Sequence, residues 1–293
     1  MHKFLRAAGF SMYQKKKDIN ALLKCLSKDV NASRCIQTDR DVNFCEIRSE
    51  IAPGLGIAMY GELDEKDELE VEYYYPYLSN DTVTSAAECS VQRHAEKETY
   101  AGLLDEYKVG ISLIFYLLNS MEFREAAMKK NPSIKVESVN LSALSVHGKV
   151  LLPIKKTANQ IEKEKVASRN RDSLMEAAKN GDEDAMESLT IEDIDLYSQA
   201  SRRAMKEDIY SIVDTCFMPS GIECDQYSVV GEIKGFELRK NKITGEEIYD
   251  LQLDCNDLMF RVAINKMDLL GEPEAGRRFK GRIWMQGIAN LKK

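Results

Sequence analysis

Apolar and polar residues alternate with a period of two in the last quarter of the chain. Tyr249, Leu251 and Leu253 fall on one face of an extended chain, and the positions between them are polar. Residues 256–257 form a turn signal, after which residues 258–264 alternate again. Because successive side chains of a strand point to opposite faces, this pattern predicts a hairpin of two half-buried strands.

A long alternating run precedes this hairpin and changes phase at a glycine. The odd-numbered residues Val229 and Ile233 share one face, whereas beyond Gly235 the even-numbered Phe236 is the apolar residue on that face. A phase slip at glycine indicates a β-bulge or the corner of a barrel. We therefore expect one long strand that bends at Gly235.

The remaining C-terminal residues complete a small β domain. Residues 265–270 predict one helical turn, and residues from 279 onward predict a final strand. This order of elements resembles an oligonucleotide-binding type of barrel, which has five strands where four are visible in this sequence. We expect an antiparallel, barrel-like domain over residues 223–293.

The N-terminal half predicts an α+β domain over residues 1–155. Two short helices at 4–8 and 19–26 have apolar residues at helical spacing. An antiparallel meander of three alternating strands is expected to follow. The three strands cover residues 45–51, 55–59 and 69–77.

Residues 85–130 predict a long helix. Its second half, residues 109–121, is apolar nearly all round and is too short to cross a bilayer, so a buried helix under the sheet is expected. Residues 134–154 then predict two strands that turn tightly at His147 and Gly148.

The middle of the chain, residues 156–222, is polar and charged and predicts a helical connector between the two domains. Asn180 and Gly181 separate two helical patterns, as in a single hairpin of a helical repeat protein, but no second copy follows. Thr190 and Asp193 have capping-box spacing, which predicts the start of another helix.

Composition is ordinary for a soluble globular protein of about two domains. The chain has 293 residues, of which 44% are hydrophobic and 30% charged, and its formal net charge is −7. Arg6 interrupts the first apolar stretch, so no secretory signal is expected and an intracellular, non-membrane location follows. The seven cysteines are scattered without a CxxC pair, which predicts reduced thiols and no zinc site.

Motifs that identify a reaction are absent from the sequence. There is no GxGxxG, phosphate loop, HExxH or GxSxG motif, so neither a cofactor nor a metal is expected. Glu223, Cys224 and Asp225 cluster before the β domain, but a cysteine nucleophile needs a nearby base. Only His94 or His147, brought across by the fold, would supply one, so a tight structural connection is the favoured interpretation.

The final strand carries a second candidate site. An aromatic ring that alternates outward among cations suits a stacked base and its phosphates. The alternative is that the tryptophan is a core residue whose N–H reaches a carbonyl. Residues 225–293 contain 12 basic and 11 acidic residues, which is little positive charge for a nucleic-acid surface and favours the core interpretation. The candidate binding residues are Arg277, Arg278, Lys280, Arg282 and Trp284.

Four tyrosines lie close together in the segment ELEVEYYYPYL. Alternation predicts that Tyr73, Tyr75 and Tyr77 are buried and that Tyr74 faces outward. A patch that contacts a protein partner is the alternative, because tyrosine offers a large contact area with one polar tip.

Several segments together resemble a known family. They are TIEDIDLYSQASRR, DIYSIVDTCFMPSGIECDQYSVVGEI, TGEEIYDLQLDCNDL and INKMDLLGEPEAGRRFKGRIWMQG. They are similar to uncharacterised proteins of Gram-positive, clostridia-type bacteria that are described only as a domain of unknown function. The resemblance is strongest over residues 190–287 and extends loosely to the N-terminal HKFLRAAGF. It implies a bacterial cytoplasmic protein and supplies no site residues.

Three hypotheses follow from the sequence. The first is a non-enzymatic binding or regulatory protein that engages a protein partner through its sheets, which accounts for the missing reaction motifs. The second is a single-stranded nucleic-acid-binding protein that uses the basic residues around Trp284. The third is an enzyme with an unrecognised site around Cys224. The first is the interpretation we adopt.

Overall fold

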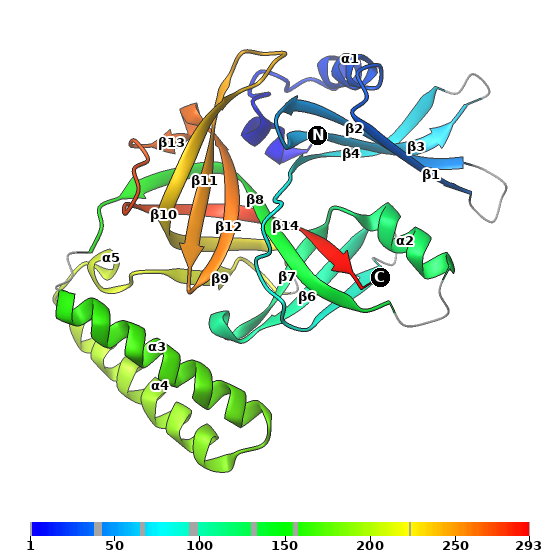
Figure 1. Ribbon diagram of the computed structural model, residues 1–293. Helices are drawn as coiled ribbons and strands as arrows, with labels where there is room; N and C mark the ends of the chain where they lie inside the picture. Colours follow the sequence, from blue (N-terminus) through cyan, green and yellow to red (C-terminus); the bar gives the residue numbers. More distant parts are fainter. Residues whose placement is uncertain are drawn as a thin grey trace. The chain divides into compact units, whose positions relative to one another are not determined.

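The computed structural model describes residues 2–37, 43–64, 68–93, 99–129, 134–154, 158–222 and 224–292 (Figure 1). The chain divides into two compact units. The first combines Met1–Leu151 with Phe217–Lys293, and the second is Leu152–Cys216. Both helices and strands are present, as the α+β prediction expects.

A four-stranded antiparallel sheet lies near the N-terminus of the first unit. Two helices precede it, η1 (Lys3–Ala8) and α1 (Lys16–Leu26), as expected. The strands follow the order β1-β2-β3-β4. They are β1 (Ala32–Gln37), β2 (Asn43–Ala52), β3 (Leu55–Leu63) and β4 (Leu69–Leu78). The predicted meander is confirmed as β2 to β4, whereas β1 has no apolar alternation and was not predicted.

The second sheet of this unit is mixed, and its described residues form ten strands. The order along the sheet is β13-β8-β12-β11-β10-β14-β7-β6-β5, and β9 pairs with β10. The strands are β5 (Cys89–Arg93), β6 (Tyr100–Glu106), β7 (Ile111–Leu117), β8 (Val136–Leu151), β9 (Cys216–Pro219), β10 (Gln226–Lys240), β11 (Glu247–Cys255), β12 (Leu258–Asn265), β13 (Leu269–Leu270) and β14 (Arg278–Leu291).

Strand β8 joins the two halves of the chain. It pairs with β12 in parallel and with β14 in the antiparallel sense. Since β14 also pairs with β10, and β10, β11 and β12 are consecutive neighbours, five strands form a closed circuit of hydrogen-bonded pairs. We expected residues 1–155 and 223–293 to be separate domains, but β8 belongs to the first segment and pairs with strands of the second, so both contribute to one unit.

The local details of the predicted C-terminal hairpin are confirmed. Asn256 and Asp257 have φ values of 56° and 59°, the left-handed backbone that a two-residue hairpin turn requires. The pairing of β10 with β11 shifts register between Ile233 and Gly235, where the sequence predicts a bulge. The expected helical turn is η3 (Lys266–Asp268).

The long helix predicted over residues 85–130 is wrong. The described part of this segment contains β5, β6 and β7, then η2 (Tyr107–Val109) between β6 and β7, and finally α2 (Ser120–Lys129). Burial in β7 alternates, with Leu113, Phe115 and Leu117 fully buried. A short apolar run fits a buried strand as well as a buried helix, and the neighbouring strands β6 and β14 decide in favour of the strand.

The turn predicted at His147 and Gly148 is also wrong, because β8 continues through both residues. A Cβ atom on Gly148 would lie 2.4 Å from the ring of Phe279 on β14. Glycine is therefore required here by close packing between strands and not by the conformation of a turn.

The second unit is a helical hairpin made of α3 (Ala158–Lys179), α4 (Glu183–Ala204) and the short α5 (Ile209–Ile212). Gly181 has φ 89° in the predicted turn, and the side chain of Asp182 accepts a hydrogen bond from the backbone N–H of Ala185. Asp182 is thus the N-cap of α4. The helix start predicted at Thr190 is wrong, since this residue lies inside α4 and donates to the carbonyl of Met186.

Two cysteines are joined by a disulfide, which corrects the prediction that all thiols are reduced. Cys35 of β1 and Cys45 of β2 lie directly opposite one another, with their Cα atoms 4.1 Å apart. Their proximity depends on the pairing of an unpredicted strand, so the spacing along the chain gave no sign of it.

Candidate binding cavity

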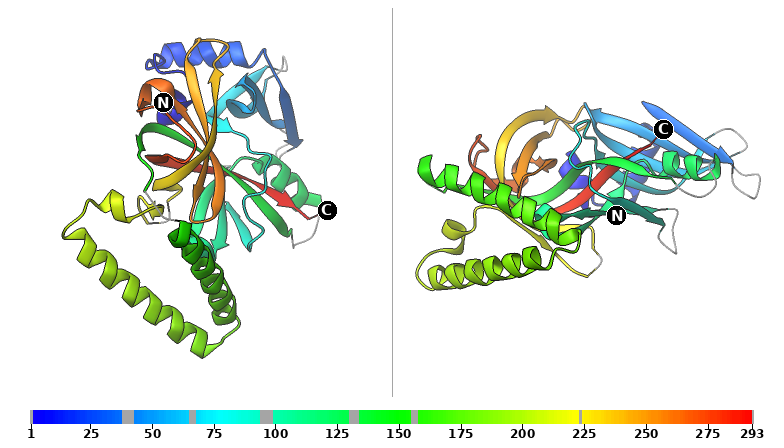
Figure 2. Two further views of the ribbon diagram at one scale, coloured as in Figure 1. Left: turned by 60° about the vertical axis from the view of Figure 1, so that its left-hand side comes forward. Right: turned by 60° about the horizontal axis from the view of Figure 1, so that its bottom comes forward.

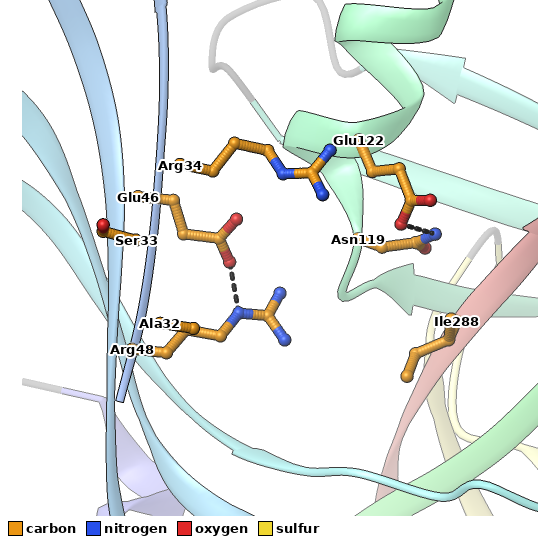
Figure 3. Close-up of a pocket in the computed structure, with 8 residues that line it drawn as sticks. All are labelled: Ala32, Ser33, Arg34, Glu46, Arg48, Asn119, Glu122 and Ile288. Carbon is orange, nitrogen blue, oxygen red and sulfur yellow. Dashed lines mark hydrogen bonds and ion pairs between the residues drawn. The ribbon is translucent and has the colours of Figure 1, made fainter. Parts of the chain in front are cut away.

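A cavity of about 280 Å³ lies within the first unit, between β1 and β2 on one side and the start of α2 and β14 on the other (Figure 3). We call it the two-arginine cavity. It is lined by Ala32, Ser33, Arg34, Glu46, Arg48, Asn119, Glu122 and Ile288.

The register of two strands places the charged side chains of the cavity on one face of the sheet. Arg34 on β1 lies opposite Glu46 on β2, and Arg48 follows Glu46 by two residues. Side chains two residues apart on a strand share a face, so these three project together. In Figure 3 the guanidinium groups of Arg34 and Arg48 both extend from the strands toward Asn119 and Glu122.

Arg48 is held firmly and keeps one donor free. Its Nε atom donates to Glu46, and its Nη2 atom donates to the backbone carbonyl of Leu118. The guanidinium also lies 5.2 Å from the centre of the Tyr77 ring. Burial lowers the pKa of Arg48, but the Glu46 carboxylate more than offsets this and raises the pKa above its ordinary value. In the part of the chain that the structure describes, no hydrogen bond engages Nη1.

Behind Arg48, a buried network fixes the Glu46 carboxylate. The hydroxyl of Tyr60 donates to Glu46 at 2.8 Å, and the hydroxyls of Tyr60 and Tyr75 are 2.7 Å apart. Burial raises the pKa of both tyrosines well above the ordinary value, so they remain neutral donors. Glu46 is therefore satisfied within the protein and leaves the arginine to face the cavity.

The opposite wall supplies one amide and one weakly held carboxylate. Asn119 donates to the carbonyl of Ala289 and accepts from its N–H, which fixes the amide. The same amide nitrogen is 3.3 Å from the carboxylate of Glu122, a long contact. Arg34 is 43% exposed and pairs with Glu125 of α2 at 3.0 Å. Such a surface pair contributes little stability, so Arg34 can exchange its partner for a ligand.

These groups together suit a ligand that carries a carboxylate. Arg48 offers a fixed Nη1 donor, and Arg34 offers a second guanidinium beside it. The lining contains two arginines and two glutamates, so it has no net charge. A ligand with both a carboxylate and an amine matches this balance better than a phosphate does, because Glu122 can accept from the amine.

A second cavity, of about 440 Å³, is lined by Lys240, Gly245, Glu246, Glu247, Asn265, Lys266 and Met267. Its polar groups largely satisfy one another. Lys266 pairs with Glu247 at 2.7 Å, and Glu246 accepts from the side chain of Asn265 at 2.6 Å. It is the weaker candidate for a ligand site.

The structure does not bring the five candidate residues of the final strand onto one exposed surface. Trp284 is 5% exposed, its ring stacks on Phe4 at 5.3 Å, and its N–H donates to the carboxylate of Asp225 at 2.7 Å. Arg278 is also buried. Arg277 pairs with Glu274.

Lys280 is half-buried, and Arg282 is the most exposed cation of the strand. The five residues do not share an exposed surface because β14 lies in the interior of its sheet, between β10 and β8. In addition, η1 contacts β8 and β12 and brings Phe4 over Trp284.

The cluster around Cys224 has a structural role where it is described. The Cys224 sulfur accepts from the backbone N–H of Gln226 at 3.3 Å, and Asp225 is engaged by Trp284. Glu223 and His94 lie outside the described residues, and His147 is exposed on β8. Among the residues described, no group of three His, Cys, Asp or Glu side chains is arranged to hold a metal ion.

Sequence reasoning did not find the residues of the two-arginine cavity. Glu46 and Arg48 occupy the polar positions of an alternating strand, which is the ordinary pattern of a solvent-facing side. The neighbouring segment of α2 and β14 covers that side, and nothing near these residues in the sequence indicates it. The tyrosine prediction is confirmed for Tyr75 and Tyr77, which are buried, whereas Tyr73 and Tyr74 are both half-buried.

An antiparallel sheet, a mixed sheet and a polar cavity define this α+β protein. The chain belongs to the family described as "Domain of unknown function, E. rectale Gene description (DUF3881)", which it matches over residues 5–287. This confirms the resemblance to uncharacterised clostridia-type proteins. No curated protein and no solved structure matches the chain. Within the described residues, none of the helices combines the length and the apolar character that crossing a membrane requires.

Proposed function

We propose that this protein is a non-enzymatic binding protein that receives a carboxylate group in the two-arginine cavity. The observation that carries the proposal is the Arg48 guanidinium, which is fixed by Glu46 and Leu118, lines the cavity, and has no hydrogen bond at Nη1 to any described residue. A charged donor held in place in this way loses little entropy when a ligand binds. Arg34 and Glu122 then position the rest of the ligand.

The carboxylate has two sources, a small amino acid or an acidic segment of a protein partner. A protein partner agrees with the expectation from the sequence. Because the lining has no net charge, affinity depends on directed hydrogen bonds and only weakly on salt.

Calorimetric titration of the full chain tests the proposal and separates the sources. The probes are L-glutamate, succinate, inorganic phosphate and a peptide that contains Glu and Lys side chains. We expect L-glutamate or the peptide to bind more tightly than succinate, which lacks the amine, and phosphate to bind weakest.

The matched variants are Arg34→Ala and Arg277→Ala, since both arginines are partly exposed and each pairs with a glutamate. Arg34→Ala should weaken binding by about tenfold or more, which corresponds to one lost charged hydrogen bond. Arg277→Ala should leave it unchanged. Absence of binding by every probe at millimolar concentration, or an equal loss in both variants, would overturn the proposal.

Single-stranded nucleic-acid binding is the second proposal, and the closed circuit of β8, β10, β11, β12 and β14 supports it. Five strands is the number in an oligonucleotide-binding barrel, and β8 supplies the strand that was missing from the C-terminal segment. With Trp284 buried, contacts would fall to the more exposed Arg277 and Arg282. Anisotropy of a labelled oligonucleotide should show binding that high salt abolishes; no binding at low salt would count against it.

A bacterial cytoplasmic location is also part of the proposal, and family membership is its support. Cytoplasmic disulfides are usually transient, so the Cys35–Cys45 bond would there respond to redox state.

A further inference from the structure

The helical hairpin of the second unit buries few of the side chains that the structure describes. Each of its two long helices contains 22 residues. Of the side chains that the structure describes in α3 and α4, only that of Ala185 is buried. Figure 2 shows the two helices separating with distance from their turn. Helices derive most of their stability from packing an apolar face, so a partner that covers such a face would stabilise this hairpin.

An apolar stripe runs along the side of α4 that faces away from α3. Arg171 of α3 pairs with Asp193 at 2.6 Å and with Glu192 at 3.4 Å, which marks the side of α4 toward α3. Ile191, Ile194 and Tyr197 recur every three residues on the other side and are 54%, 59% and 76% exposed, while Leu196, on the side of Glu192, is 58% exposed. Large apolar residues grouped on one helix face are typical of a packing surface.

The charges at the two ends of α4 are opposite. Residues 183–187 contain three acidic side chains, and the last turn of α4 contains Arg202 and Arg203. Three further acidic residues, Glu192, Asp193 and Asp195, lie between the two ends, and the first two of these pair with Arg171. Charges of these signs also stabilise a helix through its dipole, so they do not by themselves identify a contact surface. The apolar stripe identifies the surface, and the charges indicate the orientation of its partner. A helix with one acidic and one basic end is complementary to itself when the second helix runs antiparallel.

We infer that α4 packs against α4 of a second copy of this chain, so that the two α4 helices run antiparallel at the contact and α3 of each copy lies on the outer side. A two-fold axis at Ile194 places Ile191 of one copy opposite Tyr197 of the other. The same axis brings Glu187 near Arg202. This is an isologous contact, in which the same patch serves both copies, and the closed symmetry limits the assembly to a dimer. A parallel pairing would instead bring like charges together at both ends.

Sedimentation equilibrium of the full chain, over protein concentrations around the micromolar range, measures this association. The wild type should be a dimer. Ile194→Asp places two negative charges against each other on the axis and should weaken association by more than about tenfold. Its matched control is Ile222→Asp, because Ile222 is 95% exposed and lies outside the hairpin. Circular dichroism confirms that both variants retain their helices.

A charge exchange tests the antiparallel orientation. Glu187→Arg alone and Arg202→Glu alone should each weaken the dimer, and the double variant should restore it. A monomeric wild type, a dimer that persists in Ile194→Asp, or equal loss in Ile222→Asp would overturn the inference. Failure of the double variant to recover would overturn the antiparallel arrangement. The cavity proposal is independent of all these outcomes.

Discussion

Removal of Arg48 should destabilise the first unit strongly, because it leaves a buried carboxylate without its counter-ion. The Glu46 side chain is 7% exposed and that of Arg48 is 19% exposed. Breaking a buried ion pair from one side costs about 3–5 kcal/mol. The hydrogen bond from Tyr60 remains and lessens the loss, so we expect Arg48→Met to lower the free energy of unfolding by about 3 kcal/mol.

The double variant Glu46→Gln, Arg48→Met separates this explanation from a simple loss of packing. It removes both charges and leaves an amide that Tyr60 can still reach, so it should recover at least about half of the loss. Arg34→Ala is the matched control. Its pair with Glu125 is largely exposed, and its removal should change stability by less than about 1 kcal/mol.

Urea unfolding followed by tryptophan fluorescence is the assay. The chain has one tryptophan, and Trp284 is buried against Phe4 in the first unit, so its emission reports this unit and not the helical hairpin. A loss below about 1 kcal/mol in Arg48→Met would refute the reasoning. So would a double variant as unstable as the single one, because the lost stability would then not reside in the unpaired carboxylate.

Three further predictions concern stability. Burial lowers the pKa of His2 to about 4 in the folded chain, whereas the imidazole of the unfolded chain binds a proton near pH 6.5. Protonation therefore favours the unfolded chain as the pH falls below about 6.5. Wild type should therefore lose up to about 3 kcal/mol relative to His2→Phe between about pH 6.5 and 4 in urea unfolding, and parallel pH profiles would contradict this. Reduction of the Cys35–Cys45 bond, whose sequence separation is 10, should cost roughly 2.5 kcal/mol, whereas an unchanged unfolding midpoint after verified reduction would count against it. Gly148→Ala should cost about 1–3 kcal/mol by overpacking. Gly235→Ala, whose added Cβ would lie 3.7 Å from the nearest side-chain atom, should cost less, and equal losses would exclude the packing explanation.

Features that depend on neighbours along the chain followed from the sequence. Backbone preferences of one or two residues set three of these features. They are the hairpin turn at Asn256 and Asp257, the bulge at Gly235, and the connection between α3 and α4 at Gly181. The meander of β2 to β4 follows from alternation and short connections. Each of these elements meets its partner within a few residues, so the local pattern contains the necessary information.

Features that depend on distant partners were decided only by the tertiary structure. The apolar segment of β7 is a strand because β6 and β14 supply its hydrogen bonds. Gly148 lies within a strand and is needed because the ring of Phe279 packs against it. Arg48 lines a cavity because the segment around Leu118 covers one face of β2. The alternation within β2 predicts that this face is polar and exposed to solvent. Local alternation specifies which side chains share a face, but only long-range pairing specifies what that face meets.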